Sequence, residues 1–71
     1  MTVIEYRGYR ITPASYENSD MPGYWFPLAV VDSPSGDSTR VALQPARGIA
    51  KADADVAAMN EAKRRVAANN L

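Results

Sequence analysis

Apolar and polar residues alternate with helical spacing over residues 50–69, the longest stretch without glycine or proline. At about 100° per residue one stripe of this stretch is apolar. It contains Ala52, Met59, Ala62 and Val66, with Val56 at its margin. Acidic residues come in the first turns and basic residues later, which suits the helix dipole. We therefore expect a helix that packs on a sheet through this stripe, with Glu61 and Arg65 paired on its solvent side.

Three earlier stretches, rich in β-branched and aromatic residues, have the composition of strands. They span residues 3–12, 24–32 and 38–45. The last alternates most regularly, which places Thr39, Val41 and Leu43 toward the helix and Arg40, Ala42 and Gln44 away from it. The chain is thus expected to be one α+β domain over residues 1–71, a three-stranded antiparallel meander with one C-terminal helix packed on one face (β-β-β-α).

The first strand breaks strict alternation. Ile4 and Tyr6 fall on one face of a regular strand, whereas Tyr9 and Ile11 fall on the other. A β-bulge at Arg7-Gly8 would bring all four side chains to one face, and we favour that arrangement. A tight hairpin at the same dipeptide is the alternative, but it leaves strands of only about four residues.

Two polar stretches separate the strands. Residues 13–23 form a long loop, which is either functional or mobile. Residues 32–37 contain proline and glycine and form a turn. Pro27 cannot donate a hydrogen bond to a neighbouring strand, so regular pairing of the second strand is expected to begin around Leu28.

The composition narrows the chemistry. The sequence has no cysteine and no histidine, and eight basic residues balance eight acidic ones. Histidine, the commonest general base, the cysteine thiolate and the usual nitrogen and sulfur metal ligands are therefore missing. Asp53 and Asp55 would point roughly 160° apart on a helix, so they cannot share a proton or a metal. Structural roles at the N-terminus of the helix are therefore favoured for both. We expect no catalytic, metal or cofactor site, no membrane span and a cytoplasmic location.

The sheet face away from the helix is the candidate functional surface. If Phe26, Leu28 and Val30 face the helix, this other face is unusually apolar for a solvated sheet. The candidate interface residues are Trp25, Ala29, Val31, Arg10, Arg40 and Gln44. Two alternatives remain open: Trp25 packs beneath the long loop, or the two strand faces are reversed.

A homodimer is the expected assembly, because two-fold dimers are common and a domain this small has a thin core. The expected function is that of a non-enzymatic protein-interaction domain. The alternative is a nucleic-acid-binding module that uses Trp25, Arg10 and Arg40 to hold single strands. The balanced charge makes nucleic acid the less favoured partner. An enzyme is the third possibility.

Two resemblances accompany this interpretation. The run from Tyr6 to Ile11 (YRGYRI), then Tyr24-Trp25 and a final alanine-rich helix, resembles small bacterial β-β-β-α proteins, some grouped with HicB-like antitoxins. The turn at residues 32–36 only partly matches the PDLPG-like turn of that group. The element order is also similar to the C-terminal part of double-stranded-RNA-binding domains. There a basic cluster opens the last helix, whereas here two aspartates at 53 and 55 would repel phosphates.

Overall fold

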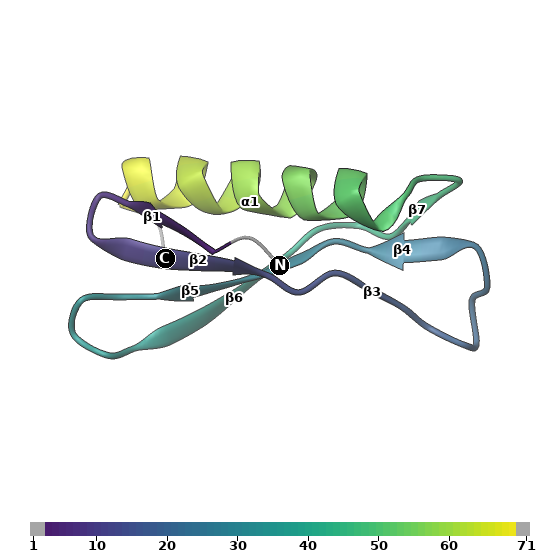
Figure 1. Cartoon of the computed structure of the whole chain (residues 1–71), viewed down its shortest axis with the longest axis horizontal. Coiled ribbons are helices and arrows are strands. Elements are labelled where there is room, and N and C mark those ends of the chain that lie inside the picture. The colour runs from purple at the N-terminus through teal and green to yellow at the C-terminus, as the bar shows by residue number, and fades with distance from the viewer. Residues whose placement is uncertain (1–2, 70–71) are drawn as a thin grey trace.

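The computed structural model describes residues 3–69, which form seven strands and one helix (Figure 1). The strands are β1 (Ile4–Tyr6), β2 (Tyr9–Pro13), β3 (Tyr16–Glu17), β4 (Tyr24–Phe26), β5 (Leu28–Asp32), β6 (Ser38–Ala42) and β7 (Ala46–Arg47), and the helix is α1 (Lys51–Ala67). The α+β class and the C-terminal helix are confirmed. The single three-stranded meander is wrong, because the strands form two antiparallel sheets.

Prolines explain why there are two sheets instead of one. Sheet A has the order β1-β2-β5-β6, and sheet B has the order β3-β4-β7. A proline lies at each break: Pro13, just after the first expected strand, ends β2, Pro27 separates β4 from β5, and Pro45 precedes β7. A proline cannot donate to the strand ladder, so the ladder stops there and resumes in the second sheet. Sheet A pairing of the second strand begins at Leu28, as expected, but its first residues are paired as well, in sheet B.

The first strand is a hairpin, and the expected bulge is wrong. Arg7 and Gly8 have φ values of 53° and 84°, and positive φ at both central residues is what a two-residue type I′ turn requires. The turn pairs Ile4 with Ile11, and Tyr6 with Tyr9. Directly opposed residues share a face, so all four side chains still lie together and pack against the core.

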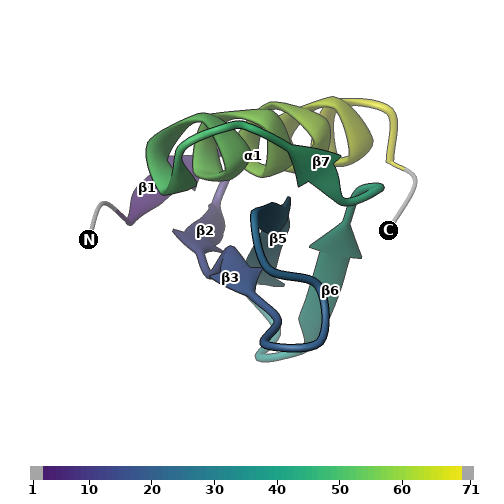
Figure 2. The same ribbon diagram turned by 90° about the vertical axis from the view of Figure 1, so that its right-hand side faces the viewer.

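The helix lies on one side of both sheets and contacts β2, β5, β6 and β4 (Figures 1 and 2). Its buried stripe has a spacing of four residues: Ala54, Ala58, Ala62 and Val66. On the expected stripe, Ala62 and Val66 are buried and Met59 packs against the core, but Ala52 and Val56 are exposed. The stripe is therefore rotated from the expected one.

Sheet A presents small and β-branched side chains to this helix. Ile11, Ala29 and Val41 are fully buried, and Val31 is 1% exposed. Because both layers offer short side chains, the helix can pack close to the sheet. The core is consequently compact, and every position in it is sensitive to added volume or charge.

The two polar stretches contain hydrogen-bonded structure. Within residues 13–23, β3 pairs with β4, and a turn follows in which Tyr24 N–H donates to the Met21 carbonyl at 3.2 Å. The turn after β5 forms as expected, with Ser33 N–H donating to the Asp37 carbonyl at 2.8 Å. The expected long loop therefore contains a short strand, and the direct connections between paired strands are residues 18–23 and 33–37.

Candidate functional site

The side of sheet A opposite α1 is left open by the described part of the chain (Figure 2). Strand register assigns the side chains of this side: Arg10 lies opposite Asp32, Thr12 opposite Val30, Val30 opposite Arg40, and Leu28 opposite Ala42. We call these residues the open face: Arg10, Thr12, Leu28, Val30, Asp32, Arg40 and Ala42. One end of the open face is polar, and the end toward sheet B is apolar.

A groove of about 370 Å³ lies at the apolar end, where sheet A meets sheet B. We call it the junction groove, and its lining residues are Tyr16, Phe26, Pro27, Leu28, Arg40, Ala42 and Leu43. The rings of Tyr16 and Phe26 stack with centroids 5.1 Å apart and an interplanar angle of 9°. Tyr16 is 48% exposed. The junction groove therefore extends the apolar surface from sheet A onto sheet B.

Two of the expected interface residues lie in the core. Ala29 is fully buried and Val31 is 1% exposed, both in the cluster that contacts the helix. Their outward placement is wrong, and the alternative in which the strand faces are reversed is the one observed for β5. Leu28 and Val30 take their place on the open face. A signal for this was available, since Asp32 has the same parity as Leu28 and Val30, and a charged residue indicates the solvated side.

The remaining expected interface residues are at the surface, but they are not gathered in one place. Arg10 and Arg40 are exposed on the open face. Gln44 is exposed in the segment between β6 and β7. Trp25 is half-buried and alternates with Phe26 along β4, so it projects from the side opposite the junction groove. The aromatic residues on the groove side are Tyr16 and Phe26, neither of which was among the expected interface residues.

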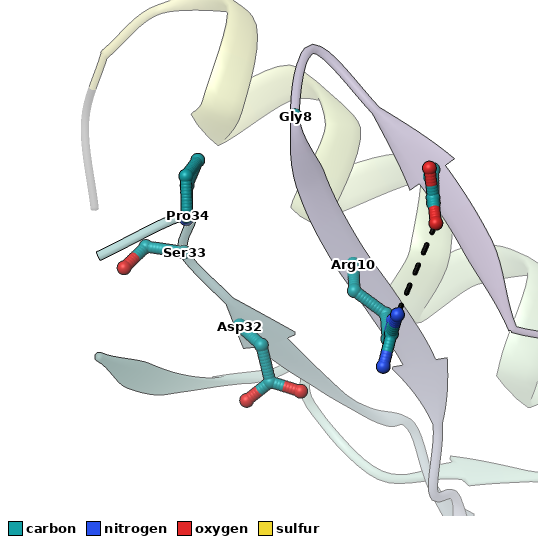
Figure 3. Close-up of a pocket in the computed structure, with 6 residues that line it drawn as sticks. Gly8, Arg10, Asp32, Ser33 and Pro34 are labelled. Carbon is teal, nitrogen blue, oxygen red and sulfur yellow. Dashed lines mark ion pairs between the residues drawn. The ribbon is translucent and has the colours of Figure 1, made fainter. Parts of the chain in front are cut away.

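The polar end of the open face carries both signs of charge. A shallow pocket of about 260 Å³ there is lined by Glu5, Gly8, Arg10, Asp32, Ser33 and Pro34 (Figure 3). Arg10 lies 3.9 Å from Glu5, and both side chains are more than 60% exposed. The Ser38 hydroxyl donates to Asp32 at 2.5 Å. Exposed pairs of this kind contribute little free energy, so this end is a hydrated polar rim.

The helix is attached to the sheet junction through Asp55. The Ser15 N–H donates to Asp55 Oδ1 at 3.1 Å, and Lys51 Nζ donates to Oδ2 at 2.7 Å. Ser15 is buried, and its hydroxyl accepts the Leu28 N–H at 3.2 Å. Burial raises the pKa of Asp55, but hydrogen bonds from Lys51 and Ser15 outweigh it and hold that pKa below its ordinary value. Asp55 thus has a structural role, as expected, although the N-cap residue is Ala50.

An Asp55→Ala variant should lose about 1–3 kcal/mol of unfolding free energy, because the Ser15 N–H becomes a buried donor without a partner. Asp53→Ala is the matched control, since Asp53 is an exposed acid of the same helix. This variant should lose less than about 0.5 kcal/mol of unfolding free energy. Urea denaturation at pH 7 measures both. Equal losses in the two variants would contradict the role of Asp55.

The lowered pKa values of Asp55 and Glu61 predict that the fold loses stability in acid. Hydrogen bonds from Arg64 and Arg65 lower the pKa of Glu61 to about 2, and the expected Glu61–Arg65 pair is present at 2.9 Å. Depressed carboxyl pKa values stabilise the fold above the unfolded-state pKa and lose that effect as pH falls through the folded-state value. Stability should therefore decrease between about pH 5 and pH 2, and Asp55→Ala should flatten this decrease.

Within residues 3–69, no group of three or more potential acidic, histidine or cysteine ligands is placed to hold a metal ion. The one helix in that range is too short and too polar to cross a membrane. Searches of protein-family models, curated proteins and solved structures find no match for this chain.

Proposed function

We propose that this chain is a non-enzymatic protein-interaction domain that associates with a second copy of itself through the open face and the junction groove. The observation that carries the proposal is the apolar end of the open face. A sheet whose other side is covered by a helix normally presents polar residues to water. Here Leu28, Val30 and Ala42 continue into the ring pair of Tyr16 and Phe26. A contiguous apolar surface with a polar rim is typical of protein contacts.

The dimensions of the molecule set how much of this side a second copy would have to cover. Its Cα atoms extend over 37 × 19 × 18 Å, so the side opposite the helix spans roughly 37 × 18 Å, or about 700 Å² in projection. Stable interfaces bury about 800 Å² on each partner. Because about 800 Å² of accessible surface exceeds the projected area, the whole of this side, with the relief of its side chains, would have to take part in a face-to-face dimer.

The charges also suit a second copy. The chain has a formal net charge of zero, and the open face carries Arg10 and Arg40 together with Asp32. A surface with both signs can oppose a copy of itself without net repulsion, whereas a surface of one sign cannot. The thin core gains from such burial, since four of the eight hydrophobic residues that are buried within the range 3–69 are alanines.

Light scattering across a concentration series, at low and high salt, tests the proposal. We expect a mass that rises toward twice 7.7 kDa and persists in salt, because apolar contacts are not screened. A monomer at every concentration would refute self-association. If that monomer bound single-stranded oligonucleotides with an affinity that falls as salt rises, the result would favour the nucleic-acid-binding function, with Arg10 and Arg40 as the phosphate contacts.

A further inference from the structure

The junction groove has the features of a small-molecule site. Its volume of about 370 Å³ lies within the usual range for ligand pockets. Its walls are apolar, formed by the stacked rings of Tyr16 and Phe26 and by Leu28 and Ala42. One charged residue, Arg40, completes the lining. An apolar pocket with a single charged group selects ligands that have an apolar body and one charge of the opposite sign.

Arg40 is available to such a ligand. Its side chain is exposed and forms no hydrogen bond or ion pair with any residue in the range 3–69. On the open face Arg40 lies opposite Val30, and the acid nearest to it in register, Asp32, is diagonal to it. Asp32 accepts the Ser38 hydroxyl at 2.5 Å. The guanidinium can therefore offer its planar pair of donors to a carboxylate that enters the groove.

We propose that the junction groove binds small aromatic monocarboxylates, with the ring among the apolar walls and the carboxylate on the Arg40 guanidinium. The stacked rings of Tyr16 and Phe26 offer the offset and edge-to-face contacts that aromatic ligands prefer. A single arginine matches a single negative charge. Multiply charged anions are disfavoured, because Asp32 lies on the same face and the chain has no excess positive charge.

This inference goes beyond the proposed self-association and does not require it. The ligand and a second copy would use some of the same residues, so they would compete. The binding experiment is therefore performed at a protein concentration where light scattering gives the monomer mass. A failure to dimerise leaves the groove proposal intact, and a failure to bind leaves the dimer proposal intact.

The test is a titration of the ¹⁵N-labelled chain with 3-phenylpropionate, followed by two-dimensional NMR. We expect saturable shifts of the backbone amides of Tyr16, Phe26, Ala42 and Leu43. The neutral 3-phenylpropanamide has the same shape and should bind about tenfold more weakly, because it lacks the charge that Arg40 recognises. Rising salt should weaken binding of the acid more than binding of the amide.

Arg40→Gln should weaken binding of the acid about tenfold and leave the amide unchanged. Arg47→Gln is the matched control, since Arg47 is exposed but does not line the groove, and it should bind as the unmodified chain does. Ala42→Phe should fill the groove and block both ligands while the melting temperature is kept. Shifts that do not saturate, equal affinity for the acid and the amide, or undiminished binding by Arg40→Gln would each overturn the proposal.

Discussion

An Ala58→Asp variant is expected to be unfolded at 25 °C. Ala58 is fully buried where α1 meets the sheet, and it lies between Ala54 and Ala62 on the buried stripe. A carboxylate at this position has no cation to pair with in the core cluster, and burying it costs several kcal/mol. A domain of this length has a total stability of only about 4–10 kcal/mol. Far-UV circular dichroism and a thermal melt measure the loss.

Ala57→Asp is the matched control, with the same chemical change one position earlier. Ala57 is exposed, so we expect that variant to fold and to melt within a few degrees of the unmodified chain. Ala52→Asp should fold as well, because Ala52 is also exposed. An unfolded Ala57→Asp beside a folded Ala58→Asp would show that the helix buries a different stripe.

A Val30→Glu variant is expected to weaken self-association by about 100-fold or more and to leave the monomer folded. Val30 is at the centre of the open face, between Thr12 and Arg40. In the monomer the new carboxylate lies opposite Arg40, which is a favourable cross-strand pair. In a face-to-face dimer both copies would have to bury it, and desolvating charges across an interface costs several kcal/mol. Light scattering gives the association constant, and a thermal melt tests the fold.

Val56→Glu is the control for this change. Val56 is 58% exposed on the helix, so the same substitution there adds a charge away from the open face. Its mass distribution should match that of the unmodified chain. Loss of association in Val56→Glu but not in Val30→Glu would place the interface on the helix side of the molecule.

Elements with strong local signals were predictable. The helix was expected over residues 50–69 and is observed at Lys51–Ala67, because an alanine-rich stretch without glycine or proline has little local alternative. In β6, Val41 is buried and Arg40 and Ala42 are exposed, as the alternation predicts. Leu43 was expected to face the helix, but it lies beyond β6 and lines the junction groove. The Glu61–Arg65 pair depends only on helical spacing and is also present.

The hairpin shows where a local pattern admits two solutions. A bulge and a two-residue turn at Arg7-Gly8 both bring Ile4, Tyr6, Tyr9 and Ile11 to one face. The apolar pattern specifies the shared face and does not specify the path of the chain. The positive φ values of Arg7 and Gly8 identify the path as a two-residue turn. Glycine adopts a positive φ without strain, which suits position 8.

The apolar pattern by itself determined that this chain has a C-terminal helix, strands around Leu28–Asp32 and Ser38–Ala42, and an open sheet face. Only the tertiary structure decided which side chains each face carries. In the helix, alanine occurs on every side, so periodicity cannot distinguish the stripe of Ala58 from that of Ala52. In β5 both faces are apolar, so alternation does not show which face is buried. Ala29 and Val31 are buried because they pack against the alanines of the helix. Close packing between two layers depends on both partners, and no single stretch of sequence contains both.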